Sequence, residues 1–123
     1  MLAGDAIVLF AEGTSSDGKD ILPFRSALIG AATEACVRLP AGKIFIQPLS
    51  ISYAGEARTV TPWYGDMDLV PHFIRVLRMP RVQAILSWGE PIAYSGQSDR
   101  KEVARELEEE VRALTQRAHS QYT

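Results

Sequence analysis

Several features that define large protein classes are scarce or missing in this chain of 123 residues. Its single cysteine, Cys36, allows no internal disulfide, and two isolated histidines add no metal-ligand set. The net charge of −2 at pH 7 gives no basic footprint for nucleic acid. No apolar run approaches the roughly 18 residues that span a bilayer. Residues 1–5 also lack the basic start of a signal peptide.

The residues that are present have the balance of a soluble globular chain, with 46% hydrophobic and 23% charged residues. A chain of this length forms one domain at most. A lone cysteine suits a reducing compartment. We therefore predict a cytoplasmic protein with no metal, no cofactor and no nucleic-acid partner, and we leave open a peripheral contact with the inner membrane.

Residues 7–24 are the stretch around which the rest is organised. The bulky apolar run of residues 7–10 predicts a buried strand. Seven of the nine residues from Gly13 onward are turn formers, which predicts a polar loop at the carboxyl end of that strand. Because ligands bind at such strand ends in open α/β sheets, we expect a binding site in this loop.

The loop matches part of a nucleotide-binding P-loop and part of the serine-hydrolase motif, but it completes neither. Residues 13–19 match the first part of a phosphate-binding P-loop, yet Asp20 stands where a magnesium-binding Ser or Thr is needed. Pro23 also disfavours a helical Leu22, where the P-loop helix should run. Residues 13–17 lack the second glycine of the serine-hydrolase motif. Neither chemistry is expected.

Helices and strands alternate after the loop. The predicted elements are helices over 24–39, over 68–79 and from Asp99 onward, with strands over 43–53 and 82–88. Residues 54–65 are a predicted loop or hairpin, and 94–98 a flexible stretch. Pro48 cannot donate to a ladder, so strand 43–53 needs a bulge or an edge at that point. This strand is otherwise apolar enough for burial on both faces.

Each predicted helix has one apolar face that we expect to be buried. Cys36 lies on the first of these faces and is expected to pack as a small hydrophobe. Glu108 precedes Arg112 by four residues, the favourable order for an exposed ion pair. The three faces consist of Ala27, Leu28, Ala31, Ala32, Ala35 and Cys36; of Val70, Phe73, Ile74 and Leu77; and of Val103, Leu107, Val111 and Leu114.

Two groups of side chains allow either a structural or a membrane role. Trp63 and Tyr64 either cap the core or meet lipid head groups, as amphipathic aromatic residues do. Arg75, Arg78 and Arg81 either form a solvated face or contact anionic lipid. The sequence leaves both pairs of alternatives open.

Three motifs resemble the glycerolipid acyltransferases, the 1-acylglycerol-3-phosphate acyltransferase family. Residues 10–16, Phe-Ala-Glu-Gly-Thr-Ser-Ser, resemble the family's F-P-E-G-T-R-S block, and residues 22–25 resemble its Pro-Phe-Lys/Arg segment. Residues 46–49 are similar to its Ile/Val-x-Pro-Val/Ile strand. The variant Gly-Thr-Ser-Ser-Asp-Gly looks most like the branch that acylates lyso-ornithine lipid.

The resemblance implies an α/β fold: part of a glycerol-3-phosphate acyltransferase-like domain, with a mostly parallel or mixed sheet and covering helices. The family's catalytic His-x-x-x-x-Asp motif is absent, since Leu77 stands five residues after His72. Residues 1–123 therefore look like the C-terminal portion of such a domain, without its upstream catalytic portion. We expect no catalytic residue in this chain.

The function implied by the resemblance is acceptor binding in a lysophospholipid or lyso-ornithine lipid O-acyltransferase. Such an enzyme moves an acyl chain from acyl carrier protein or coenzyme A to a lysolipid hydroxyl. The implied acceptor-binding residues are Glu12, Gly13, Thr14, Ser15, Ser16 and Arg25. Glu12 alternatively caps the loop locally.

One position departs from the family. Ser15 replaces the family's phosphate-binding arginine, and a hydroxyl holds phosphate less well than a guanidinium. Either Arg25 or Lys19 compensates, or the acceptor's head group is not a simple phosphate. An amino-acid head group, as in lyso-ornithine lipid, satisfies the second option.

A second hypothesis is a non-catalytic, truncated product that self-associates as a homo-oligomer. Half a sheet leaves apolar surface and a strand edge uncovered, and both favour association.

Overall fold

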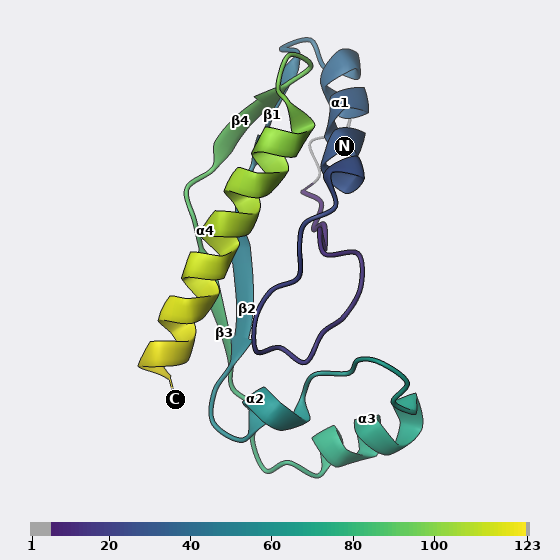
Figure 1. Ribbon diagram of the computed structural model, residues 1–123, viewed down its shortest axis with the longest axis vertical. Helices are drawn as coiled ribbons and strands as arrows, with labels where there is room; N and C mark the ends of the chain where they lie inside the picture. The colour runs from purple at the N-terminus through teal and green to yellow at the C-terminus, as the bar shows by residue number, and fades with distance from the viewer. Residues whose placement is uncertain (1–5, 123) are drawn as a thin grey trace.

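The computed structural model describes residues 6–122, and its centre is a long two-stranded ribbon (Figure 1). The ribbon consists of two antiparallel pairs placed end to end. The first pair joins β1, Lys43–Ile46, to β4, Ile92–Ser95, and the second joins β2, Leu49–Tyr53, to β3, Ala84–Trp88.

The ribbon is interrupted at Pro48, as the sequence predicts. Between the two pairs, Gln47 and Pro48 lie opposite residues 89–91. The segment between β3 and β4 therefore has one residue more than the segment between β1 and β2. This mismatch is a bulge, which accommodates a proline that cannot donate to a ladder. The Gly89 amide donates to the Pro48 carbonyl at 3.0 Å, and the Gln47 side chain donates to the Gly89 carbonyl at 3.0 Å.

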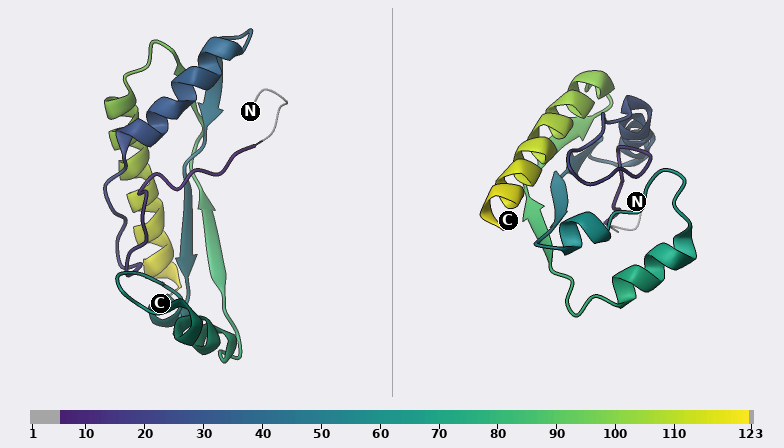
Figure 2. Two further views of the ribbon diagram at one scale, coloured as in Figure 1. Left: turned by 90° about the vertical axis from the view of Figure 1, so that its right-hand side faces the viewer. Right: turned by 60° about the horizontal axis from the view of Figure 1, so that its bottom comes forward.

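Two helices cover one side of the ribbon (Figure 2). They are α1, Ser26–Arg38, and α4, Arg100–Gln121. The Asp99 side chain caps α4 by accepting from the Lys101 amide at 2.8 Å, which confirms the predicted start. The core between helices and ribbon includes Ala11, Ile29, Ala32, Cys36, Tyr94, Ala104 and Leu107.

Several buried polar groups in this core are paired. Tyr94 is fully buried, and its hydroxyl shares a hydrogen bond with the Thr33 hydroxyl at 2.9 Å. The Ser50 hydroxyl on β2 lies 2.7 Å from the Thr115 hydroxyl on α4. Cys36 is buried, as predicted, and its thiol donates to the Tyr94 carbonyl. The prediction that 94–98 is a flexible stretch misplaced Tyr94 and Ser95, which belong to β4.

The outer face of the ribbon is open, against the prediction that strand 43–53 is buried on both faces. Phe45, Ile51, Leu86 and Trp88 all stand exposed on this face, Trp88 at 59%. Residue alternation along a strand sends neighbouring side chains to opposite faces, and α1 and α4 cover the other one. No element within residues 6–122 covers the Phe45 side.

The apolar face of the third helix is also uncovered, so the prediction that Val70, Phe73, Ile74 and Leu77 are buried is wrong here. The helix is α3, Leu69–Leu77, and it lies beside the short helix α2, Ala57–Val60, at the lower end of Figure 1. Phe73 is 57% and Leu77 67% exposed. In the part of the chain that is described, α2 is the one helix or strand that α3 contacts.

Residues 7–10 do not form the predicted buried strand. No strand is assigned over 6–10, and Phe10 is 71% exposed. A strand needs a neighbour for its backbone hydrogen bonds, and within 6–122 both strand pairs are formed by other segments. All four assigned strands pair antiparallel. A larger mostly parallel or mixed sheet of the acyltransferase type therefore stays a prediction.

Candidate functional site

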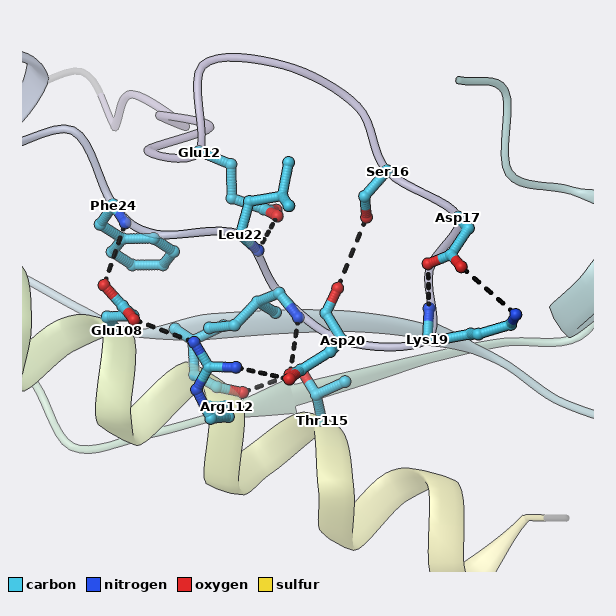
Figure 3. A network of polar contacts seen from close by, with 12 residues as sticks. Glu12, Ser16, Asp17, Lys19, Asp20, Leu22, Phe24, Glu108, Arg112 and Thr115 are labelled. Atoms are coloured by element: carbon cyan, nitrogen blue, oxygen red, sulfur yellow. Dashed lines mark hydrogen bonds and ion pairs between the residues drawn. The ribbon is translucent and has the colours of Figure 1, made fainter. Parts of the chain in front are cut away.

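The polar loop between residues 11 and 25 is closed by Glu12. Its carboxylate Oε2 accepts a hydrogen bond from the Leu22 amide at 2.6 Å (Figure 3). The Arg25 amide donates to the Ala11 carbonyl at 2.8 Å, so the two ends of the loop are tied twice. This geometry matches the alternative in which Glu12 caps the loop. Its contact with an acceptor stays a prediction.

Gly13 lets Arg25 lie against the base of the loop. Its φ of 70° is in the left-handed region that favours glycine. A Cβ on Gly13 would lie 2.8 Å from both Cδ and Nε of Arg25, which is too close for contact. Arg25 uses this space to donate from Nε to the Glu12 carbonyl at 3.3 Å. Glu12, Gly13 and Arg25 thus form one cluster.

The tip of the loop presents hydroxyl groups. Thr14 and Ser15 are exposed, while Ser16 is half-buried. The Ser16 hydroxyl accepts from the Gly18 amide at 3.3 Å and donates to the Asp20 carbonyl at 3.5 Å. Lys19 is paired with Asp17, at 3.5 Å from Nζ to the carboxylate. The tip is therefore an internally bonded turn whose free groups are hydroxyls.

Helix α4 holds the loop through one arginine. Arg112 donates to Asp20 at 2.6 Å and to Glu108 at 2.9 Å (Figure 3). The other oxygen of Glu108 accepts from the Phe24 amide at 3.1 Å. The hydrogen bond with Glu108 raises the pKa of Arg112 above its ordinary value. The predicted Glu108–Arg112 pair is confirmed, and it also anchors both the turn and the exit of the loop.

A hollow of about 270 Å³ lies between the loop tip and the α2 end of the ribbon. Ser15, Ser16 and Gly18 form the loop wall, and a Cβ on Gly18 would lie 3.0 Å from Pro62 Cγ. Glu12, Gly13, Thr14 and Arg25 are not among its lining residues. The predicted site residues therefore fall into two groups, with Ser15 and Ser16 at the hollow. The other lining residues include Ser52, Arg58, Thr61, Trp63 and His119.

The two histidines have structural partners. Arg58 Nη2 donates to His119 Nδ1 at 3.0 Å, because a guanidinium has no acceptor. Burial, followed by the nearby Arg58 charge, lowers the pKa of His119 below 6.5. His72 donates from Nε2 to the Val60 carbonyl at 3.0 Å, which links α3 to α2.

Neither a metal site nor a membrane-spanning helix is found in the described chain. Across residues 6–122, no three histidine, cysteine, aspartate or glutamate residues cluster as metal ligands. Within the same range, no helix has the length and apolar character needed to cross a bilayer.

Sequence comparison identifies relatives that share most of this chain. The lyso-ornithine lipid O-acyltransferase of Brucella abortus is 42% identical over 126 aligned residues, which cover 96% of this chain and 47% of that protein. The proteins of the same name from Rhizobium meliloti and Pseudomonas aeruginosa are 38% and 35% identical, over 90% and 89% of this chain. These matches cover 41% and 40% of the two relatives. No family model matches, and no solved structure matches significantly.

These relatives are all named as lipid acyltransferases. Over the range it shares with them, this chain is similar to the lyso-ornithine lipid O-acyltransferases, which confirms the resemblance predicted from residues 10–16. The chain spans less than half the length of the relatives it matches.

Proposed function

We propose that this chain is the acceptor-binding part of a lyso-ornithine lipid O-acyltransferase. The observation that carries the proposal is the 42% identity over 96% of the chain to a protein of that name. The complete protein would transfer an acyl chain from acyl carrier protein or coenzyme A to a hydroxyl of the lysolipid. That step needs a general base, and we assign none to this chain.

The polar loop is the proposed acceptor site. Glu12 fixes the loop through Leu22, and Gly13 gives Arg25 its place beside the loop base. Thr14 and Ser15 then offer free hydroxyls at the tip, and Ser16, which donates to Asp20, contributes as an acceptor. An ornithine head group has both charged and hydrogen-bonding atoms, so hydroxyls and one guanidinium are suitable partners for it.

Calorimetric titration with a short-chain lyso-ornithine lipid, kept below its micelle concentration, tests this proposal. We expect saturable binding of one lipid per chain, and weaker binding of an N-acyl glycine of equal length, which lacks the ornithine side chain. Exchange of Thr14 and Ser15 together for Val and Ala should weaken binding severalfold. Both side chains are exposed, so folding should not change. The exposed Ser120→Ala variant serves as control. Equal affinity for both ligands would contradict the proposal.

A membrane-facing role for α3 is part of the proposed function. At about 100° per residue, Leu69, Phe73 and Leu77 fall on one arc of the helix, and each is exposed. On the same wheel Arg78 falls about 100° beyond Leu77 and Arg75 lies on the opposite side of the helix, and α3 itself contains no acidic residue. An exposed apolar face on a helix whose charged side chain is basic fits a bilayer surface with anionic lipids. The exposed Trp63 lies in the segment that leads to this helix.

The uncovered ribbon face supports a further proposal about the fold. Phe45, Leu86 and Trp88 form an exposed apolar surface that a larger acyltransferase-like α/β domain would cover. The alternative is that two copies of this chain cover it for each other. Sedimentation separates these options: a compact monomer contradicts self-association, whereas a dimer that Leu86→Gln dissociates supports it.

A further inference from the structure

The hollow beside the loop contains two buried hydroxyls that do not belong to the proposed acceptor loop. Ser52 Oγ and Thr61 Oγ1 are both buried and have no hydrogen-bond partner among the described residues. Ser52 is only 3% exposed, and both residues line the hollow. Buried hydroxyls are almost always paired because desolvation without a partner is costly. Their position points to a ligand group that accepts hydrogen bonds.

The same hollow contains a positive charge that no carboxylate neutralises. Arg58 lines it from α2 and donates to Nδ1 of the His119 ring. Within residues 6–122, no carboxylate forms an ion pair with Arg58. Two loop carboxylates have other partners, since Asp17 pairs with Lys19 and Asp20 with Arg112, although the charge of Asp20 also acts on His119.

The loop supplies the remaining wall. Ser15 and Ser16 line the same hollow, and the exposed Ser15 hydroxyl is a free donor beside the Arg58 guanidinium, whereas Ser16 already donates to Asp20. A guanidinium with hydroxyl donors is the donor set that binds carboxylate and phosphate groups.

We infer that this hollow is an oxyanion site for the head group of the acceptor, with Arg58 as the counter-charge and Ser52 and Thr61 as hydrogen-bond donors. The inference rests on the proposed function for the identity of the acceptor, and the ornithine carboxylate is the group it takes. A phosphate has similar chemistry, so the experiment must distinguish the two anions.

The experiment compares variants of the whole chain in titrations with three probes: short-chain lyso-ornithine lipid, N-acetylornithine and inorganic phosphate. Binding is followed by calorimetry and by the side-chain NMR signals of His119. Arg58→Gln should weaken binding of the lipid about tenfold or more, as expected when a charged hydrogen bond is lost. Arg38→Gln, an exposed arginine on α1, should leave it unchanged.

Ser52→Ala keeps the test independent of folding defects. Its hydroxyl has no partner to lose, so this variant should unfold at the same temperature or higher, while lipid binding weakens about threefold to tenfold. Arg58→Lys should recover part of the binding, since it keeps the charge but not the bidentate geometry.

The outcomes separate the two proposals. Full lipid binding by Arg58→Gln and Ser52→Ala overturns the oxyanion site and leaves the proposed function intact. Absence of lipid binding, with His119 signals that still shift with N-acetylornithine, supports the anion site and contradicts the proposed function. Shifts with phosphate but not with N-acetylornithine overturn the assignment to the carboxylate. A wild-type chain that responds to no probe overturns both.

Discussion

Removal of the Glu12 carboxylate is the perturbation that most directly probes how the loop is built. Its Oε2 accepts from the Leu22 amide at 2.6 Å, and the side chain is half-buried. A hydrogen bond to a charged group contributes about 1.5–3 kcal/mol net. The Leu22 amide is only partly buried, so water can replace part of this contact in Glu12→Ala. We therefore expect the lower end, a loss of about 1.5 kcal/mol in the free energy of unfolding.

The assay combines thermal unfolding with amide hydrogen exchange. A loss of this size should lower Tm by about 6 °C for a chain of this length. Glu12→Gln, which keeps an acceptor without the charge, should lose about half as much. Glu109→Ala is the matched control because its carboxylate forms an exposed i, i+4 pair with Arg105, worth about 0.5 kcal/mol or less. Equal effects of Glu12→Ala and Glu109→Ala, or unchanged exchange at the Leu22 amide, would refute the loop closure.

Three further outcomes follow from the structure. Gly13→Ala should cost about 2 kcal/mol by chemical denaturation and Gly42→Ala about 1 kcal/mol, since both have positive φ but only a Cβ on Gly13 would also displace the Arg25 side chain from its contact with Glu12. The free energy of unfolding should fall as pH drops below 6.5, because the pKa of His119 is lowered in the folded chain and the unfolded chain therefore takes up the proton first. Denaturation curves recorded from about pH 5 to 8 measure this fall, which should be absent in His119→Gln. Phe73→Gln should weaken binding to vesicles that contain phosphatidylglycerol about fivefold, while the equally exposed Leu86→Gln should not, and equal effects would contradict a membrane-facing α3.

The elements that could be predicted from the sequence are those fixed by local rules. Helix α4 begins at the predicted cap, Asp99, and buries the predicted Leu107, Val111 and Leu114. The bulge at Pro48 follows from the missing amide hydrogen of proline. The turn-rich loop after Gly13 is likewise confirmed as irregular structure. Each of these features depends on residues only a few positions apart.

The features that could not be predicted from the sequence depend on contacts between segments that are far apart in the chain. Periodicity placed Phe73 and Leu77 on one face of a helix, but it cannot say whether protein, lipid or solvent covers that face. The bulky run that ends at Phe10 predicted a strand, and only a neighbouring strand could have made it one. The contact of Arg112 with Asp20 joins residues 92 positions apart, and nothing in either segment indicates the other.

Two residues of the candidate site were missed for the same reason. Arg58 and Ser52 lie in segments without a motif, and the structure brings them to the loop wall formed by Ser15 and Ser16. Ser52 is identified by its buried hydroxyl without a partner and Arg58 by its place in the wall of the same hollow, and both signals are visible only in three dimensions.

The account depends on a lipid head group being held by the loop between Glu12 and Arg25. A proton–nitrogen NMR spectrum of the chain, recorded with increasing short-chain lyso-ornithine lipid, tests this most directly. The account predicts saturable shifts that concentrate at the amides of residues 13–18, with little change along the exposed side of α4. Saturation without shifts in that loop, or shifts confined to the open ribbon face around Trp88, would contradict it.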